Sequence, residues 1–391
     1  MENNFLLKEK FRPGSMYHLV EWNQLNPEER KTLTGLYDEV DVYGIFQPAF
    51  TSPALTAKVA YREVALLYLH LQQSDLLPRY LIASGEQRLH ETIVQLVLDS
   101  ILEIEFNGDF VSGPAAVKAI FGNGFFESSV IPDRLSKLSM EGIQYAWTLR
   151  NPDARSIANK LYSFNTTPWD ASARSDFYAT YTVKKFLFPD SDISLNQLLN
   201  EQWNFLNANG KKAWLSWIRP TVNQSLSTQP GDFNFKLYIS PIIKDLPEVF
   251  RLTVPIISSS PAFSFKVGGE LPGLLRPDKM VVYFENKEAL KETAAILEKE
   301  LAGYSAQGVP FTSQLDKTGL LSWGSDPPES DVLTLIEGGS WRTKVTDQLA
   351  LAIIRAKADR LDRQQAIHFI QAKLSAAGIN TVDWTPMNQS N

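Results

Sequence analysis

The sequence predicts an α+β protein, with a mostly helical N-terminal domain followed by a C-terminal domain of mixed sheet and helices. Apolar residues before residue 150 recur at helical spacing. Short runs typical of strands dominate after residue 230, separated by single helices without strict strand–helix alternation. The segment 151–175 between these two patterns is rich in Asn, Asp, Ser, Thr and Pro. We therefore expect two domains, at 1–160 and 161–391.

Three helical patterns and one hairpin account for the N-terminal half. Apolar side chains at 56–73 and at 89–102 are dense and lie three or four residues apart, so we expect two helices that pack on each other. Residues 132–149 repeat the pattern. An Asn-Gly pair stands between short alternating runs within 103–111, which predicts a β-hairpin because this pair favours a tight turn.

The C-terminal half begins with a strand whose side chains alternate. In 233–240, Lys236 and Tyr238 share one face, and Leu237 and Ile239 share the other. Asn286 is a plausible N-cap for a later helix, and Gly303 a plausible stop. Further strands are expected at 263–267, 280–284, 309–315 and 320–323, and helices at 287–301, 346–358 and 364–377.

The composition is typical of a folded globular protein. Of the 391 residues, 44% are hydrophobic, and the net charge of −6 argues against binding to nucleic acid through a broadly basic surface. The absence of cysteine excludes disulfides, thiolate nucleophiles and thiolate metal sites. The four histidines are scattered, and none forms a ligand pair at helical spacing. We therefore expect no metal site and no cofactor.

The sequence predicts a soluble, cytoplasmic protein without a membrane partner. The N-terminal residues lack the apolar core of a secretory signal, and no apolar run approaches the ~18 residues that a membrane-spanning helix needs. Export through a type III system into a host cell stays open, because such a signal has no pattern of this kind.

Motifs for several common activities are missing. The P-loop, the dinucleotide-binding GxGxxG fingerprint, the HExxH zinc motif and the GxSxG nucleophile elbow do not occur. Nucleotide hydrolysis, dinucleotide binding, zinc proteolysis and α/β-hydrolase chemistry therefore have no local support.

The residues 262–285 concentrate cations around a loop that contains glycine and proline. Strand alternation places Lys266 opposite the apolar residues of its strand, and Arg276 and Lys279 stand at the entrance of the next strand. The glycines of 268–273 would allow a tight turn that presents N–H groups to an oxyanion. This pattern predicts an anion site, with phosphate as the natural ligand.

Two further observations bear on this site. The alternative interpretation is a strand–loop–strand unit whose cations are solvated, with Asp278 and Glu285 as surface partners. Near the C-terminus, Arg342 follows Gly338 and Gly339 just before a predicted helix. The glycines could form an anion nest, although a helix cap is the commoner use of such a pattern.

An ordered set of motifs resembles the HopA-type type III effector family. The motifs are ILEIEFNGDFVSG (101–113), KLYISP (236–241), PAFSFKVG (261–268), LLRPDKMVVYF (274–284), GVPFTSQL (308–315), GLLSWGSDPP (319–328) and SWR (340–342). The family includes plant-pathogen effectors and the lyase-like partners of class V lanthipeptide and thioamitide dehydration. There, a kinase-like protein phosphorylates Ser or Thr of a precursor peptide, and the lyase eliminates phosphate to leave a dehydroamino acid.

The resemblance implies a phosphothreonine/phosphoserine lyase with a phosphorylated peptide as substrate and a kinase-like protein as partner. It implies Lys266 as the base, with Lys236 and Tyr238 as second choices for contacts to the enolate-like carbonyl or for proton return. The phosphate would be bound by residues of the cationic cluster, namely Arg276, Lys279 and Arg342. Members from peptide pathways carry Thr-Lys-Pro-Leu where this chain has TSQL at 312–315, so one cation of the family pattern is missing. The alternative is a non-catalytic, effector-like protein-interaction module.

Overall fold

The computed structural model describes eleven stretches of the chain: 6–27, 30, 41–52, 54–78, 87–122, 131–150, 153–168, 180–206, 213–220, 235–326 and 339–387. The chain divides into two compact units. Unit 1 consists of Met1–Ser129 and Gln348–Ile379, and unit 2 of Val130–Asp347 and Asn380–Asn391. The predicted α+β class is confirmed. The bounds of these units differ from the predicted division at residue 160. That division concerns domains that fold independently, and it stays a prediction.

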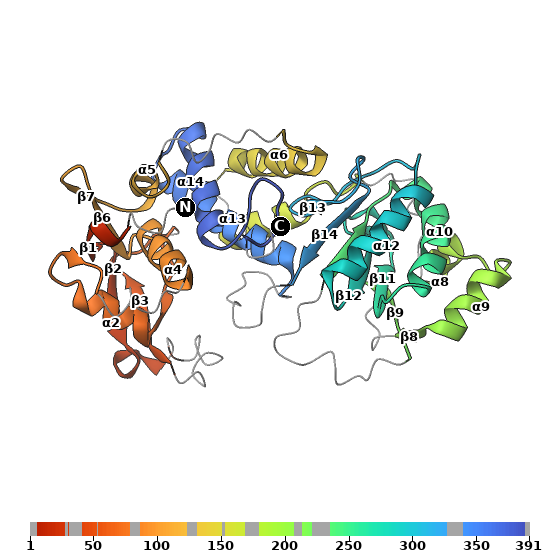
Figure 1. The fold of residues 1–391 in the computed structure, drawn as a ribbon, viewed down its shortest axis with the longest axis horizontal. Coiled ribbons are helices and arrows are strands. Elements are labelled where there is room, and N and C mark those ends of the chain that lie inside the picture. The colour runs from red at the N-terminus through yellow and green to blue at the C-terminus, as the bar shows by residue number, and fades with distance from the viewer. Residues whose placement is uncertain are drawn as a thin grey trace. The chain divides into compact units, whose positions relative to one another are not determined.

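Unit 1 contains two antiparallel sheets (Figure 1). The first has the order β5-β1-β6-β7 and the second the order β2-β3-β4. The bounds of the strands are β1 Lys10–Pro13, β2 Tyr17–Glu21, β3 Val42–Pro48, β4 Lys58–Tyr61, β5 Asp75–Leu76, β6 Leu102–Phe106 and β7 Asp109–Val111. The bounds of the helices are α2 Arg62–His70, α4 Gln87–Leu98, α5 Val117–Phe121 and α14 Arg363–Ala376, with short 3-10 turns at Leu6–Lys8, Trp22–Gln24 and Gly113–Ala116.

The mostly helical character expected for the N-terminal half is not confirmed. The hairpin predicted over 103–111 is present as β6 and β7, and α4 matches the predicted second helix. The pattern at 56–73, however, is divided between β4 and α2. The strands β1, β2 and β4 have only four or five residues and bury too few side chains to show a clear period of two. In the seven-residue β3, three buried residues follow one another, so this strand does not alternate either.

Unit 2 is built on one seven-stranded antiparallel sheet with the order β13-β14-β10-β12-β11-β9-β8. The bounds of its strands are β8 Asn204–Leu206, β9 Trp214–Ile218, β10 Phe235–Ile239, β11 Ser264–Gly268, β12 Met280–Phe284, β13 Ser313–Gln314 and β14 Leu321–Ser325. The bounds of its helices are α6 Arg134–Thr148, α7 Ala154–Tyr162, α8 Thr180–Leu187, α9 Ile193–Gln202, α10 Leu246–Ser258, α11 Leu271–Leu275 and α12 Lys287–Glu300, with a 3-10 turn at Ile243–Asp245. Helix α13 (Trp341–Ala358) begins in unit 2 and ends in unit 1.

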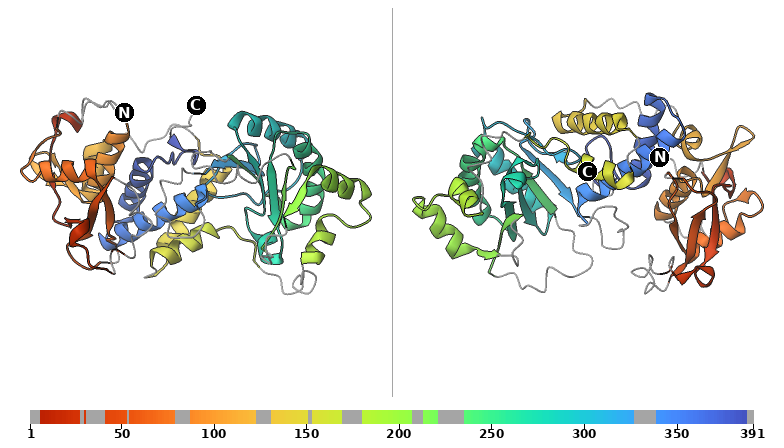
Figure 2. Two further views of the ribbon diagram at one scale, coloured as in Figure 1. Left: turned by 90° about the horizontal axis from the view of Figure 1, so that it is seen from below. Right: turned by 180° about the vertical axis from the view of Figure 1, so that it is seen from behind.

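The main core of unit 2 lies between one face of this sheet and the helices α8, α9, α10 and α12 (Figures 1 and 2). Leu237 of β10 stands opposite Val282 of β12, which stands opposite Phe265 of β11. These three side chains are buried, and the next strand adds Trp217, whose ring stacks on Phe265. Because side chains alternate along a strand, their neighbours in sequence lie on the opposite face of the sheet.

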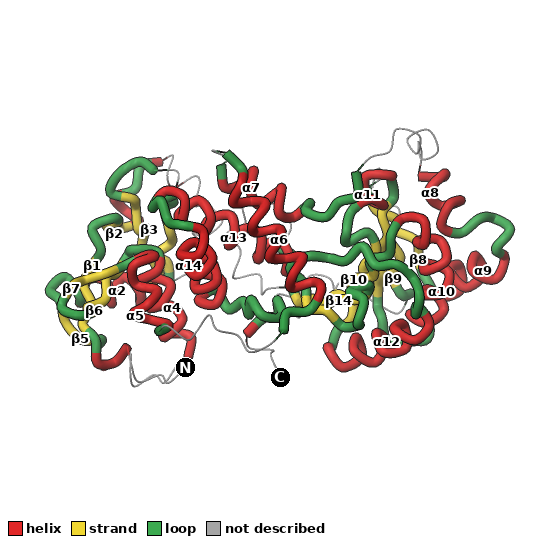
Figure 3. Tube along the Cα trace, turned by 90° about the horizontal axis from the view of Figure 1, so that it is seen from above, coloured by secondary structure: helices red, strands yellow, loops and turns green. Residues whose placement is uncertain are grey.

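Several local predictions for the C-terminal half hold. Helix α12 begins after Asn286, whose side chain accepts a hydrogen bond of 2.8 Å from the backbone N–H of Ala289. Helices α6 and α14 match the predicted helices at 132–149 and 364–377. The polar segment 151–175 contains α7, which packs beside α6 (Figure 3), and its residues 151–152 and 169–175 lie outside the described part of the chain.

The glycine loop of 268–273 is a packing junction and not an open nest of N–H groups. The N–H of Gly268 donates to Lys279 O, and the N–H of Gly269 donates to Ala213 O. A Cβ atom on Gly268 would lie 2.5 Å from the carbonyl carbon of Gly273, in the short helix α11. The glycines therefore allow α11 to approach β11 closely.

Within the described ranges, no helix has both the length and the apolar composition that a membrane crossing requires.

Candidate active site

Strand alternation gathers the predicted site residues on the face of the sheet opposite the main core. Lys236 of β10 stands opposite Tyr283 of β12, and Tyr238 stands opposite Val281. On the other side of β12, Lys266 of β11 also stands opposite Val281. One face of three adjacent strands thus carries two lysines and two tyrosines, as the period of two predicted for Lys236, Tyr238 and Lys266.

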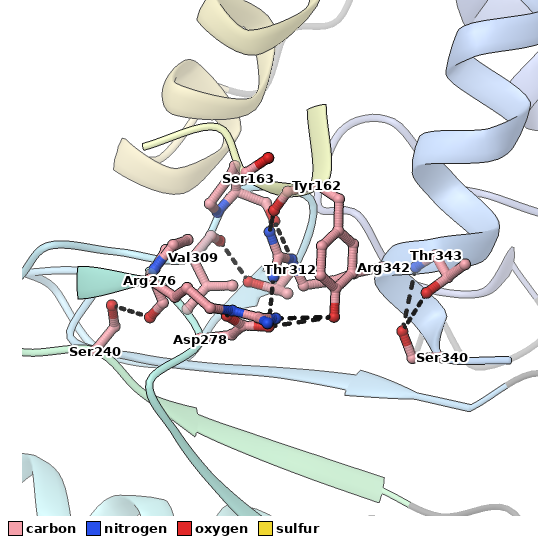
Figure 4. A network of polar contacts seen from close by, with 12 residues as sticks. Tyr162, Ser163, Ser240, Arg276, Asp278, Val309, Thr312, Ser340, Arg342 and Thr343 are labelled. Atoms are coloured by element: carbon pink, nitrogen blue, oxygen red, sulfur yellow. Dashed lines mark hydrogen bonds and ion pairs between the residues drawn. The ribbon is translucent and has the colours of Figure 1, made fainter. Parts of the chain in front are cut away.

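Asp278 is the centre of an ionic network at the entrance of β12 (Figure 4). Arg276 binds its carboxylate with two nitrogens, Nε to Oδ1 at 2.8 Å and Nη2 to Oδ2 at 2.7 Å. The guanidinium of Arg342 reaches Oδ2 at 2.8 Å, and the phenol of Tyr162 donates to the same oxygen at 3.3 Å. Burial disfavours the charged carboxylate, but Arg342 and Arg276 outweigh this effect and hold the pKa of Asp278 well below its usual range. The interpretation of Asp278 as a surface partner is therefore corrected.

Arg342, the second arginine in contact with Asp278, is only 1% exposed. Its Nη2 donates to the carbonyl of Tyr162 at 2.6 Å, and its Nε donates to the carbonyl of Pro310 at 3.3 Å. Its guanidinium carbon lies 4.5 Å from the centre of the Tyr162 ring. The end of α7 and the chain before β13 therefore fix this side chain from two sides.

Arg276 is the accessible member of the arginine pair, with 32% of its side chain exposed. Its guanidinium carbon lies 5.3 Å from the ring centre of Tyr162 and 5.2 Å from that of Trp214. Burial opposes its charge, but hydrogen bonds and attraction from Asp278 raise the pKa of Arg276 further above its ordinary value. This cation stays protonated at every relevant pH.

Lys266 is partly exposed and lies beside aromatic rings. Its Nζ is 4.5 Å from the ring centre of Trp214 and 5.5 Å from that of Tyr283. Among the described residues, no carboxylate oxygen lies within ion-pair distance of this nitrogen. Burial, with repulsion from Lys236 and Arg276, lowers the pKa of Lys266 to about 8. A large fraction of the amine is therefore neutral near neutral pH.

The two second-choice residues differ in their surroundings. Lys236 forms an ion pair of 2.6 Å with Asp326, and its Nζ lies 5.4 Å from the ring centre of Tyr283. Tyr238 is 3% exposed, and burial together with Asp326 raises the pKa of its phenol well above the ordinary value. Tyr238 is therefore a neutral proton donor over the physiological pH range.

Lys279 is not brought together with the other cations. It is fully buried, and its Nζ donates to the carbonyl of Pro241 at 2.7 Å and to Gln307 Oε1. Burial lowers the pKa of Lys279 to about 7. Lys279 precedes β12, and no local pattern in the sequence indicates that its side chain is enclosed by protein.

Gly338 lies outside the described residues, so the predicted nest at 338–339 has no structural counterpart here. Ser340 precedes α13, and its Oγ accepts a hydrogen bond of 3.2 Å from the N–H of Thr343. This geometry is that of a helix N-cap, the commoner of the two uses considered from the sequence.

The site contains residues that sequence reasoning did not select, namely Trp214, Tyr162, Tyr283, Asp278 and Asp326. Tyr283 could have been found from its alternation with Val282 in β12. Tyr162 and Trp214 could not, because α7 and β9 were not predicted. In the described part of the chain, no group of three or more His, Asp or Glu side chains is placed to hold a metal ion.

The chain is similar to solved structures of bacterial effectors. The effector protein from Pseudomonas syringae pv. tomato strain DC3000 aligns over 64% of this chain and 95% of its own, with 16% identity and a TM-score of 0.39. The effector protein from P. syringae pv. syringae strain 61 aligns over 64% and 98%, with 13% identity and a TM-score of 0.40. The Chromobacterium violaceum VirA (SpvC) phosphothreonine lyase effector aligns over 39% and 76%, with 14% identity and a TM-score of 0.26.

These solved structures include effectors, the class of protein that the sequence motifs resemble. No protein-family model matches the chain, and no curated protein sequence does.

Proposed function

We propose that the chain is a phosphothreonine/phosphoserine lyase whose base is Lys266. The observation that carries this proposal is an amine with a pKa lowered to about 8 that lies, with a partly exposed arginine, over one tryptophan ring. Both groups lie over the ring of Trp214, so a phosphorylated side chain placed there would meet them together. A base for an α-proton and a partner for phosphate are the two groups that this elimination needs.

The charge of the site supports an anionic substrate. The four cations Lys236, Lys266, Arg276 and Arg342 stand against the two carboxylates of Asp278 and Asp326, which leaves a net charge of plus two when all are ionised. A phosphate monoester carries nearly two negative charges at neutral pH. Neutralisation of Lys266 would lower the net charge to plus one, and the proton that it then removes from the substrate restores the second charge.

In the proposed reaction, the neutral amine of Lys266 takes the α-proton of the phosphorylated residue. The electron pair of the C–H bond forms the Cα–Cβ double bond, and the Cβ–O bond breaks with its electrons leaving on the phosphate. Arg276 binds the phosphate and stabilises the charge that accumulates on it. Lys236 and Tyr238 donate hydrogen bonds to the enolate-like carbonyl, and the proton that Lys266 has taken up passes to the released phosphate. We assign Lys279 to packing, since its amine is occupied within the fold.

The proposed substrate is a ribosomal precursor peptide phosphorylated by a kinase-like partner, in the cytoplasm. The family resemblance supports this substrate, and the effector-like neighbours make type III delivery into a host cell the alternative setting. The product would be a peptide with a dehydroamino acid in place of the phosphorylated residue.

The test is incubation of the purified chain with a phosphothreonine peptide, followed by mass spectrometry for loss of phosphoric acid. Lys266→Met should abolish this loss while leaving peptide affinity within about two-fold, because a base acts in the proton-transfer step whereas binding depends on the phosphate contacts. Methionine keeps most of the length of the apolar stem. The matched control is Lys291→Met, an exposed residue of α12 on the other face of the sheet, which should retain full activity.

Two outcomes would count against the proposal. Full activity of Lys266→Met would exclude Lys266 as the base. No elimination by the unaltered chain, with its kinase partner and precursor supplied, would instead favour the non-catalytic interaction module. Lys236, Arg276 and Arg342 are each paired with a carboxylate of the protein, and this pairing would then explain why the site lacks activity.

A further inference from the structure

The two arginines of the candidate site have unequal access to a substrate. Arg342 is enclosed by protein and 1% exposed: its Nη2 and Nε donate to the carbonyls of Tyr162 and Pro310, and its Nη1, which makes no hydrogen bond, lies 2.8 Å from Asp278 in an ion pair. Arg276 uses Nε and Nη2 toward Asp278, and within the described part of the chain its Nη1 has no hydrogen-bond partner. Only Arg276 therefore offers a free edge in the direction of solvent.

Asp278 connects these two arginines. Its carboxylate holds Arg276 in a two-point contact, and it is itself held by the buried Arg342. A bidentate arginine–carboxylate pair fixes the plane of the guanidinium as well as its position. The rings of Tyr162 and Trp214 lie on the same guanidinium and leave it little freedom to rotate.

Resting on the proposed function, we propose that Asp278 is a positioning residue that anchors Arg276 against the buried Arg342, so that Arg276 alone meets the phosphate. Arg342 then acts through Asp278 and does not touch the substrate. This assignment replaces the direct phosphate contact that the sequence implied for Arg342. It also explains why an anion site contains a buried carboxylate at all.

A positioning role and a purely electrostatic role of Asp278 predict opposite changes in phosphate affinity when its carboxylate is neutralised. If Asp278 only adds negative charge, its neutralisation raises the net charge of the site and strengthens phosphate binding. If Asp278 positions Arg276, neutralisation releases one of the two anchoring contacts and weakens binding despite the added positive charge. Asp326 provides the matched comparison, because it is a carboxylate of the same site that pairs with Lys236 and contacts neither arginine.

The experiment is a calorimetric titration of a phosphothreonine peptide into three proteins, all carrying Lys266→Met so that no turnover occurs. Relative to that background, Asp278→Asn should weaken binding by about ten-fold, which corresponds to the loss of a charge-assisted contact. Asp326→Asn should bind equally or up to several-fold more tightly. Equal or tighter binding by Asp278→Asn would overturn the proposal.

Loss of Asp278 leaves the charge of Arg342 buried without a carboxylate, so the single variant could fail to fold. The double variant Asp278→Asn/Arg342→Gln keeps this buried pair neutral and should show the same weakened binding. Thermal unfolding would show which of the two variants is folded. Whether that variant binds the peptide more weakly or more tightly than the background then decides the role of Asp278. If Asp278→Asn weakens binding but the unaltered chain shows no turnover, the lyase activity alone is rejected. If the unaltered chain turns over the peptide but the folded Asp278→Asn variant binds it as tightly as the background does, only the role of Asp278 is rejected.

Discussion

Three lysines in or next to neighbouring strands show how surroundings set chemistry at the residue scale. Lys236 is paired with Asp326, Lys279 is enclosed and donates to Pro241 and Gln307, and Lys266 lies beside aromatic rings without a carboxylate in contact. Burial lowers the pKa of Lys279 and of Lys266. Of these, only Lys266 is both partly neutral and accessible, which is the combination that a general base needs.

The pH dependence of elimination should follow Lys266. Because the base acts when neutral, kcat/KM should rise with pH through a midpoint of about 8 and then level off. Lys236→Met should move this midpoint to higher pH, since the repulsion from Lys236 contributes to the lowered pKa of Lys266. The measurement is initial rate against pH from about 7 to 10 with a phosphothreonine peptide, a range in which the phosphate is mostly dianionic. A flat profile, or a rate that falls between pH 7 and 9, would contradict the assignment.

The sequence pointed to Lys266 and Arg276 because they lie close together in one segment. It did not reveal Asp278 as the centre of the site, because the residues that define its role are distant. Tyr162 is 116 residues away from Asp278 and still donates to its carboxylate. Contacts of this separation depend on the fold, and no local pattern encodes them.

At the scale of elements, strand alternation was the most reliable guide. The faces predicted for Lys236 and Tyr238 against Leu237 and Ile239 are confirmed, because a period of two is a local property of the backbone. The glycine loop shows the limit of such reasoning. Glycine permits both an anion nest and close packing, and the choice between them depends on what lies nearby, here α11.

The close approach of α11 to β11 leads to a stability prediction. Gly268→Ala should destabilise the chain by about 1–3 kcal/mol, because the added Cβ would meet backbone atoms of Gly273 at 2.5 Å, and backbone cannot rotate away. The matched control is Gly339→Ala, where nothing lies within 4 Å of the added atom, and its unfolding midpoint should stay near that of the unaltered chain. Urea unfolding of both variants gives the comparison. Equal stability of the two variants would show that the junction has room to adjust.

At the scale of the whole molecule, the structure and the sequence prediction differ in which segments of the chain pack with the N-terminal residues. The prediction closed the first domain at residue 160, within the polar segment 151–175. Unit 1 instead includes the distant segment Gln348–Ile379. Composition along the chain marks boundaries between consecutive segments, and it carries no information about a segment that returns from the other end.

This discontinuous unit predicts that a fragment of residues 1–160 will not fold stably alone. The fragment lacks α14, which packs on α4 and α5. It also loses Lys373, whose ammonium pairs with Asp99, and Arg355, which donates to Ser100 Oγ at 3.0 Å. Asp99 is partly buried, and two lysines hold its pKa well below the usual range against the effect of that burial. Removal of Lys373 therefore leaves this carboxylate with Lys58 alone.

Circular dichroism with urea should show a broad, weakly cooperative transition for the 1–160 fragment, and a peptide of residues 348–379 added in trans should sharpen it and raise its midpoint. A peptide in which Lys373 is replaced by Met should restore less, because it supplies the apolar face of α14 without the partner of Asp99. A fragment that unfolds cooperatively without the peptide would support the predicted division at residue 160. It would also show that α14 adds to unit 1 without being required for its folding.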